Sequence, residues 1–306
     1  MVGIILRRLL SAVLVLWGVA TVVFLLLRVL PGDPARTILA GSGASQAAIL
    51  QLRQQLGLDD PLLLQYVRFL ADLARGDLGR SLFSHQNVTT IIGQQLPATF
   101  ELAAGALVVT TLAGLGLGIL AALRAGSWVD WLTMGGAVLG TSLPIFWSGL
   151  LMIWLFSVNL QWLPASGVGS WQHLIMPSLL LGLVGAGPLA RLVRANLLDV
   201  LRADYVLVAR AKGLPGHLVI GRHALNNALL PGITLIGLQA GFLLGGTVVT
   251  ETVFNRPGLG RVVVESILAK DLPVVQGVVL LIAACYVVIN LVVDLINLAL
   301  DPRLRT

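Results

Sequence analysis

Residues 194–231 read RANLLDVLRADYVLVARAKGLPGHLVIGRHALNNALLP, a polar stretch with an apolar run on either side. Together with Arg191, this stretch holds the densest cluster of basic side chains in the chain. The cluster consists of Arg191, Arg194, Arg202, Arg210, Lys212 and Arg222, with His217 and His223. A polar loop of this length between two membrane spans indicates contact with something outside the membrane. We therefore expect residues 194–231 to be a docking element for a partner that supplies energy.

The composition indicates a polytopic membrane protein built of α-helices. Of the 306 residues, 57% are hydrophobic and only 11% are charged, which is too little charge for a soluble domain of this size. The net charge of +6 would suit a nucleic-acid partner, but the excess basic residues lie beside the apolar runs, as membrane insertion requires. We expect lipids, and no nucleic acid, among the partners. The single cysteine, Cys285, cannot form an internal disulfide and is expected only to pack in its apolar run.

Six apolar runs are predicted to be transmembrane helices. They cover approximately residues 9–30, 99–123, 131–157, 174–189, 229–253 and 274–300. The first run is too long for the apolar part of a secretory signal and no cleavage site follows it, so residues 1–30 are predicted to hold a retained helix. Residues 97–306 are then predicted to form a core of five helices, with polar loops at 194–231 and 251–274.

Residues 31–96 have the character of a helical insertion after the first transmembrane helix. Ser45 predicts the start of one helix that ends at Gly57, and Asp60-Pro61 predicts the start of a second helix that ends at Gly76. Each helix has an apolar face, which favours helices that lie on the membrane or on the outer face of the protein. Five arginines and five aspartates make the segment neutral.

The basic residues also orient the chain. An even number of spans places both termini on one side, together with the loop 194–231. Eleven of the 20 basic residues lie on that side and are mostly unmatched by acidic residues, whereas acidic residues nearly balance the other nine. The positive-inside rule therefore predicts cytoplasmic N- and C-termini, a cytoplasmic loop 194–231 and an extracytoplasmic segment 31–96.

Two glycines and three prolines are candidates for helix packing or gating. Gly114 and Gly118 form a GxxxG pair, which lets a second helix approach closely. Pro144, Pro177 and Pro188 lie in the third and fourth runs, where we expect broken helices that line or gate a path. Helix packing without any gating role is the alternative for all five positions.

The sequence has no recognisable enzyme site. Its two lysines, Lys212 and Lys270, do not belong to a phosphate-binding loop, and its four histidines show neither a His-Glu-x-x-His motif nor metal-ligand spacing. With Glu251 assigned to the polar loop 251–274, only Glu101 and Asp294 place a carboxylate inside a predicted span, so no proton relay is visible. We therefore expect no catalysis, metal or cofactor in this chain. An ion-coupled secondary transporter is an alternative of a different class.

Within the polar loop, residues 199–212 are predicted to form a helix. Asp204 lies early in it and Arg210 late, as the helix dipole favours, and Gly213 then ends it. One face of the helix carries Leu201, Tyr205, Val208 and Lys212. Such an apolar ridge fits a groove in a partner protein, and a helix that rests on lipid head groups is the alternative.

The same loop resembles a known family. It reads Asp204-Tyr-x-x-x-Ala209-Arg-Ala-Lys-Gly213-Leu, followed by His223-Ala-Leu-x-Asn-Ala-x-Leu-Pro231. This pattern is similar to the cytoplasmic EAA loop of permease subunits in bacterial binding-protein-dependent ABC importers, specifically those of the dipeptide/oligopeptide/nickel permease family. Further matching pieces run through nearly the whole chain, among them Leu30-Pro-Gly-Asp-Pro34, Gly76-Asp-Leu-Gly79, Glu251-Thr-Val-Phe and Asp301-Pro-Arg303. The chain departs from the broader pattern at residues 207–209, which read Leu-Val-Ala where that pattern has Glu-Ala-Ala.

The resemblance implies a fold, a location and a set of partners. The fold is that of the type I ABC importer permeases, with six transmembrane helices in the bacterial cytoplasmic membrane. The partners are a homologous second permease subunit, two ATPase subunits that bind ATP and Mg, and an extracytoplasmic substrate-binding protein. The residues implied in coupling to an ATPase subunit are Leu201, Asp204, Tyr205, Val208, Ala209, Arg210, Lys212, Gly213 and Leu214.

The cargo stays open on the sequence alone. Members of this family carry dipeptides, oligopeptides, glutathione, nickel or metal chelates, and the binding protein does most of the selection. Peptides or related small solutes are our first expectation, and nickel or a metal chelate is the alternative. A membrane scaffold with no transport role is a third hypothesis.

Overall fold

The structure is a computed structural model that describes residues 2–29, 33–39 and 45–300. Across these residues all regular structure is helical, apart from an isolated bridge between Arg80 and Asn87. This confirms the all-α fold class. The chain forms two compact units, of which unit 1 comprises Met1–Pro97 and Pro257–Cys285 and unit 2 comprises Ala98–Arg256 and Tyr286–Thr306. The motif at Asp301-Pro-Arg303 and most of the motif at Leu30-Pro-Gly-Asp-Pro34 lie outside the described residues.

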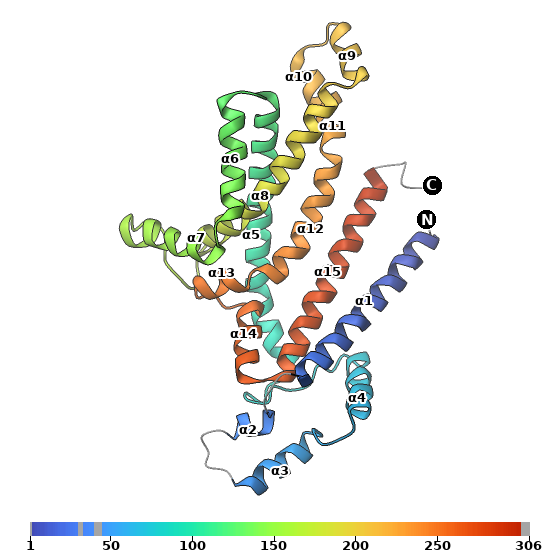
Figure 1. The fold of residues 1–306 in the computed structure, drawn as a ribbon, viewed down its shortest axis with the longest axis vertical. Coiled ribbons are helices and arrows are strands. Elements are labelled where there is room, and N and C mark those ends of the chain that lie inside the picture. The colour runs from blue at the N-terminus through green and yellow to red at the C-terminus, as the bar shows by residue number, and fades with distance from the viewer. Residues whose placement is uncertain (1, 30–32, 40–44, 301–306) are drawn as a thin grey trace. The chain divides into compact units, whose positions relative to one another are not determined.

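Unit 1 combines the N-terminal helices with a segment from the C-terminal part of the chain (Figure 1). Its elements are α1 (Val2–Val29), α2 (Pro34–Ile38), α3 (Gln46–Gln55), α4 (Leu62–Ala74), the first turns of α5 (Val88–Leu123), α14 (Leu259–Ala269) and the first half of α15 (Leu272–Leu300). Apolar side chains from the last three of these form a buried core, made of Val88, Ile92, Leu259, Val274 and Val278.

The helices predicted between residues 31 and 96 begin and end where the sequence places them. Ser45 caps α3, since its side chain accepts a hydrogen bond from the backbone N–H of Ala48. Pro61 precedes α4, as expected of a residue that fixes the entry to a helix. Gly57 and Gly76 follow the two helices with φ of +63° and +77°, the left-handed conformation that ends a helix most easily at glycine. The additional short helix α2 was not predicted.

Unit 2 contains the rest of α5, the last part of α15 and the elements from α6 to α13. The latter are α6 (Trp128–Ser142), α7 (Ile145–Met152), η1 (Ile153–Asn159), α8 (Gln172–Leu201), α9 (Asp204–Ala211), α10 (Gly216–Leu218), η2 (Val219–Ala224), α11 (Leu225–Ala228), α12 (Leu230–Gly246) and α13 (Val248–Val253). The two η elements are π-helices, which the sequence analysis did not anticipate.

Three described helices are long and apolar enough to cross a membrane, namely α5, α8 and the Leu272–Asn297 part of α15. The number rises to five if two bent helix pairs each count as one span. In α1, the apolar helix Leu10–Leu26 is shorter than these. The break expected at Pro144 in the run 131–157 is present, because α6 and the following helix bend by 106° there. The count of six spans stays a prediction.

The predicted break in the fourth span, in contrast, is wrong. Pro177 and Pro188 both lie inside α8, which continues through them for 30 residues. A proline removes one backbone donor from a helix, but a helix surrounded by other helices tolerates the loss. Pro177 is buried, in agreement with such support from neighbouring helices.

Glycines allow α8 to lie directly against the backbones of α5 and α6. A Cβ atom added at Gly118 of α5 would lie 2.7 Å from the carbonyl oxygen of Ala190. A Cβ at Gly182 of α8 would lie 2.8 Å from the carbonyl oxygen of Ala106, and one at Gly187 would lie 2.7 Å from that of Ala137. A Cβ at Gly114 would lie 2.7 Å from the Cδ2 atom of Leu189. Only glycine fits at positions where two helix backbones approach this closely.

This packing predicts opposite outcomes for two alanine substitutions on the same helix. Gly118→Ala should lower the free energy of unfolding by about 1–3 kcal/mol, because the new methyl group meets a backbone oxygen that cannot move aside. Gly116→Ala is the matched control, since nothing lies within 4 Å of its added Cβ. It should leave stability unchanged or raise it by up to about 1 kcal/mol. Denaturant unfolding of both variants in detergent tests this, and equal effects would contradict the packing.

An ion-pair triad ties α3 to the segments on either side of it. Arg53 of α3 donates from Nη1 to Asp33 and from Nη2 to Asp59, at 2.7 Å in each case. Partial burial of Asp33 would raise its pKa, but the hydrogen bonds from Arg53 and from the backbone N–H of Ala35 outweigh burial. The pKa of Asp33 is therefore below its ordinary value.

The lowered pKa of Asp33 predicts acid sensitivity of this segment. A carboxylate with a lowered folded pKa stabilises the fold above its unfolded pKa of about 3.9, and that stabilisation is lost as the pH falls through the folded value. The thermal midpoint should therefore fall below about pH 4 in the native chain, and Asp33→Asn should reduce that dependence. Asp199→Asn, which changes an exposed carboxylate of α8, is the control. An unchanged pH profile in Asp33→Asn would contradict the prediction.

Candidate partner-docking site at the end of α8

The polar stretch at residues 194–231 folds into a compact helical tip. α8 ends at Leu201, and the chain turns through Arg202 and Ala203 into α9. Gly213 then adopts φ of +76° and turns the chain back through Pro215 into α10 and η2. Figure 1 shows α9 and α10 at the far end of α8, beyond the turn that joins α5 to α6.

A small apolar core holds this tip on the end of α8. Val206 and Ala209 of α9 and Val219 of η2 are buried against one another, and Val200 and Leu201 of α8 pack on them. A second cluster beneath it joins α8, α5 and the helices that follow the tip, through Ala122, Leu197, Ala224 and Ala228. The tip is therefore packed onto the bundle and is not a free loop.

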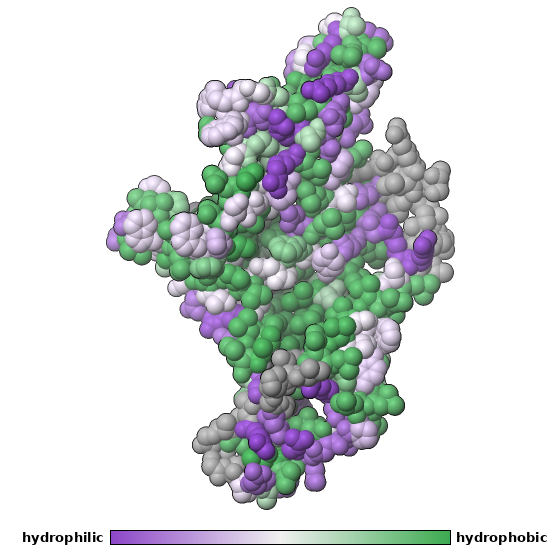
Figure 2. All heavy atoms as spheres, in the orientation of Figure 1, coloured by the Kyte–Doolittle hydropathy of each residue, from purple (hydrophilic) through white to green (hydrophobic). Residues whose placement is uncertain are grey.

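The outer face of the tip exposes large apolar side chains. Tyr205, Leu207 and Val208 of α9 are 44%, 50% and 52% exposed, and Leu214 and Leu218 are 37% and 43% exposed. Figure 2 shows apolar and hydrophilic residues side by side on this part of the surface. A partly apolar surface on a polar loop is typical of a protein interaction site.

The tyrosine of this face is fixed in place. The amide Nδ2 of Asn227 in α11 donates to the Tyr205 hydroxyl oxygen at 3.0 Å, so α9 is linked to α11 as well as to η2. Sequence reasoning did not identify Asn227, although it stands in the matched pattern Asn-Ala-x-Leu-Pro that follows the loop.

The charges around the tip follow the predicted arrangement along α9. Asp204 lies in the first turn and Arg210 in the last turn of α9, where each opposes the partial charge of the helix end. The side chains of Arg202, Arg210, Lys212 and Arg222 are exposed, and none forms an ion pair with an acidic side chain of the described residues.

The structure corrects the predicted helix 199–212 and its predicted ridge. Two helices occupy this range, because the chain turns at Arg202, and Leu201 therefore belongs to α8. Leu201 and the buried Ala209 face the internal cluster and not the surface. Tyr205, Val208, Lys212, Gly213 and Leu214 remain exposed as predicted. The sequence analysis missed Leu207 and Leu218, which extend the apolar face.

Arg194 is not a free member of the basic cluster. It forms two hydrogen bonds with Asp130 of α6, from Nε to Oδ1 at 2.6 Å and from Nη2 to Oδ2 at 2.7 Å. The backbone N–H of Gly126 donates to the same carboxylate at 2.9 Å. Asp130 is only 6% exposed, so this clamp fixes the turn between α5 and α6 to α8, close to the tip.

A second buried polar group lies elsewhere in unit 2. Glu251 of α13 is fully buried and accepts a hydrogen bond from the Thr99 hydroxyl at 2.7 Å. Arg256, which is 2% exposed, lies 3.6 Å from Glu101. Burial lowers the pKa of Arg256, and the neighbouring carboxylates of Glu101 and Glu251 oppose that shift. These groups join α5 to the segment after α13.

The described residues offer no candidate metal centre. No group of three or more His, Cys, Asp or Glu side chains among them is placed to hold a metal ion. The fold and the tip are therefore the features to compare with known proteins.

Sequence comparison with protein families matches almost the whole chain. Residues 114–306 match the family described as "Binding-protein-dependent transport system inner membrane component". Residues 1–103 match the family described as the N-terminal part of such a membrane component.

Individual relatives and one solved structure agree with the family matches. The "Glutathione transport system permease protein GsiC" of Salmonella paratyphi A is 45% identical over 305 residues, which cover 100% of this chain and 99% of the relative. The protein of the same name from Escherichia coli (strain K12) is 44% identical over the same length. The fold is similar to a chain of the MetNI methionine ABC transporter in inward facing conformations, with a TM-score of 0.56 and 19% identity. That match covers 68% of this chain and 96% of the other.

The clamp between Asp130 and Arg194 predicts a strong effect of removing one partner. Arg194→Ala should lower the free energy of unfolding by about 2–4 kcal/mol, because it leaves a nearly buried carboxylate without its guanidinium. Arg191→Ala is the control, since Arg191 is an exposed arginine on the same helix and should change stability by less than about 0.5 kcal/mol. Denaturant unfolding measures both. The double variant Asp130→Ala/Arg194→Ala should cost less than the two single effects together, and strict additivity would contradict the clamp.

Proposed function

The chain belongs to the inner membrane components of binding-protein-dependent transport systems, the permeases of ABC importers of the peptide type, and on this premise we propose how it works. It forms the translocation path together with a homologous second permease subunit. Two ATPase subunits drive the path, and an extracytoplasmic binding protein delivers the cargo. This chain is a transport subunit and performs no hydrolysis itself.

The observation that supports this proposal best is the exposed apolar face of α9. Tyr205, Leu207 and Val208 lie on a short helix that follows α8, and the basic side chains around them have no acidic partner among the described residues. A short helix with apolar anchors and a charged rim has the form that fits a groove in a partner protein. We assign the ATPase subunit as that partner. Asp204, Arg210, Lys212, Gly213 and Leu214 complete the proposed contact.

A path for movement leads from the tip into the membrane. The buried cluster of Val206, Ala209 and Val219 couples α9 to α8, and the glycine contacts couple α8 to α5 and α6. A force on α9 would therefore move α8 as a unit with its neighbours. In our proposal, ATP and Mg bind between the ATPase subunits, and their closure moves α9 so that the path changes from inward-open to outward-open.

We propose that the segment 31–96 and the loop 251–274 form the landing surface for the binding protein. The supporting feature is the orientation expected from the positive-inside rule, which places both segments outside the cytoplasm. We also propose the bend at Pro144, between α6 and α7, as a gate, because the helix is broken there. The location that follows is the bacterial cytoplasmic membrane, with both termini in the cytoplasm.

For the cargo, we propose a short peptide of the glutathione type. Relatives that are 44–45% identical over 305 residues carry the name of glutathione transport permeases. In a strain that lacks its own system, the complete importer should take up radiolabelled glutathione. Unlabelled glutathione should compete better than a dipeptide, and added Ni²⁺ should not compete. Uptake of nickel without uptake of glutathione would overturn this assignment.

A single charge on the apolar face of α9 tests the docking site. Val208→Asp should reduce ATP-driven uptake by the complete importer by tenfold or more, because a carboxylate must be desolvated in an apolar groove. The variant permease should fold and insert normally, since Val208 is 52% exposed. The measurements are uptake, co-purification of the ATPase subunits and stimulation of ATP hydrolysis by the loaded binding protein.

Ala125→Asp is the matched control for that experiment. Ala125 is an exposed alanine in the turn between α5 and α6, so the variant adds the same charge outside the tip. It should leave uptake and ATPase recovery unchanged. If Val208→Asp also retains full uptake, α9 does not dock on an ATPase, and a role on lipid head groups would explain its apolar face better.

A further inference from the structure

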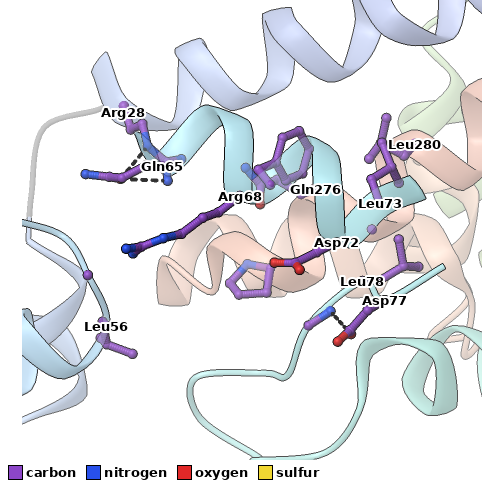
Figure 3. A pocket seen from close by; sticks show the side chains of 15 residues that line it. Arg28, Leu56, Gln65, Arg68, Asp72, Leu73, Asp77, Leu78, Gln276 and Leu280 are labelled. Carbon is purple, nitrogen blue, oxygen red and sulfur yellow. Dashed lines mark hydrogen bonds between the residues drawn. The ribbon is translucent and has the colours of Figure 1, made fainter. Parts of the chain in front are cut away.

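Unit 1 contains a cavity that the proposed function does not use. Its volume is about 300 Å³, and it lies between the end of α1, one face of α4 and the start of α15. Figure 3 shows the polar side chains that line it, with Arg28 from α1, Arg68 and Asp72 from α4, and Gln276 from α15. Cavities of this size lie at the lower end of the range that binds small ligands or parts of larger ones.

Two buried hydrogen-bond donors, on residues that line this cavity, have no partner among the described residues. They are Nη1 of Arg28 and Nε2 of Gln276. Buried polar atoms are almost always hydrogen-bonded, so two orphaned donors from different helices in one cavity indicate a missing acceptor. Both atoms only donate, which means that the missing group is an acceptor such as a phosphate or carboxylate oxygen.

The guanidinium of Arg28 is held so that one edge stays free. Its Nε and Nη2 atoms donate to the side-chain oxygen of Gln65 at 3.1 Å and 2.9 Å. The amide of Gln65 donates in turn to the carbonyl oxygens of Leu58 and Asp60, which fixes its orientation. The guanidinium also lies 3.7 Å over the ring of Phe24, a nearly fully buried residue. Arg28 is therefore held in place, and its Nη1 atom has no hydrogen-bond partner among the described residues.

The rest of the lining carries charge of both signs. Arg68 lines the cavity but already donates to Asp60 at 2.5 Å. Asp72 and Asp77 line the same cavity, and each is more exposed than Arg28. Two carboxylates beside an oxyanion site disfavour a simple anion and favour a ligand that also has a cationic group. The lining thus suits a zwitterion in which an oxyanion and an ammonium lie a few bonds apart.

The surroundings of the cavity are apolar and exposed. Leu25 and Leu26, on the turn of α1 before Arg28, are 51% and 59% exposed, and Leu63 and Val67 of α4 are 74% and 54% exposed. In a chain that crosses a membrane, such side chains contact lipid, and arginine at the end of an apolar helix lies at the level of the head groups. The cavity therefore opens where lipid head groups are present at high concentration.

We propose that this cavity binds the zwitterionic head group of a phospholipid of the phosphatidylethanolamine type. The phosphate accepts hydrogen bonds from Nη1 of Arg28 and Nε2 of Gln276, and the ammonium lies beside Asp72 and Asp77. The same chemistry of oxyanion plus ammonium exists in free peptides, so the experiment has to separate the two sources. The bound lipid would fasten α1 to α4 and α15 within unit 1.

The test uses the purified full-length chain in detergent. Native mass spectrometry measures retention of dioleoyl phosphatidylethanolamine, of dioleoyl phosphatidylglycerol and of the soluble dipeptide glycylglycine, and thermal unfolding measures the rise in Tm that each ligand gives. The native chain should retain phosphatidylethanolamine in preference to the other two. Gln276→Met and Arg28→Met each remove one orphaned donor and should weaken lipid binding about tenfold or more. Arg80→Met changes an exposed arginine that does not line the cavity and is the matched control.

Each outcome decides between these possibilities. Selective loss of phosphatidylethanolamine in both cavity variants, with Arg80→Met unchanged, supports the proposal. If Arg28→Met fails to fold, Gln276→Met still tests the proposal, because Met has nearly the size of Gln but lacks the amide group that carries the donor. Equal retention of phosphatidylglycerol would contradict the proposal that the ligand is zwitterionic. Binding of glycylglycine without lipid would contradict the proposal that the ligand is a lipid. Equal lipid binding by the native chain and Gln276→Met would overturn the site.

Discussion

The arrangement of unit 2 depends on how closely α8 approaches the backbones of its neighbours. Between apolar helices in a membrane there is no hydrophobic driving force, so association rests on packing and on polar contacts. Gly118, Gly182 and Gly187 supply that packing, because each brings a backbone carbonyl to a distance at which any Cβ atom would collide. The clamp between Asp130 and Arg194 adds a polar contact at the end of the bundle where α9 begins. α8 is thereby fixed along its length.

Because α8 is held in place by these contacts, the short helix α9 can transmit a force to it. α9 spans only Asp204–Ala211, and a helix of that length is marginal by itself. It is stable here because Val206 and Ala209 pack into a cluster with Val219 and the end of α8. A partner that moves α9 therefore moves α8, and the loss of that cluster would separate docking from transport.

Features of the fold that depend on local sequence were predicted well. Features that depend on tertiary contacts were not. Ser45, Gly57, Pro61 and Gly76 act through their own backbone and side chain, so helix ends near them were predictable. Pro177 and Pro188 were expected to break a helix, but neighbouring helices support it, and no local pattern shows those neighbours. The turn at Arg202, which moves Leu201 into the core, has no glycine or proline to reveal it. The partner of Arg194 lies 64 residues away, so its pairing could not be read from the chain.

Apolar side chains are exposed on both α4 and α9, and the charges beside them distinguish the two surfaces. Around α4 the arginines are matched, with Arg68 on Asp60, Arg75 near Asp72 and Arg53 on Asp33 and Asp59. A neutralised surface of this kind suits the zwitterionic head groups of a membrane. Around α9 the basic side chains of Arg202, Arg210, Lys212 and Arg222 have no acidic partner among the described residues. Unpaired basic side chains attract a surface of opposite charge. They therefore favour a protein partner over a neutral lipid layer. The same apolar exposure thus has two meanings in one chain, and charge pairing decides between them.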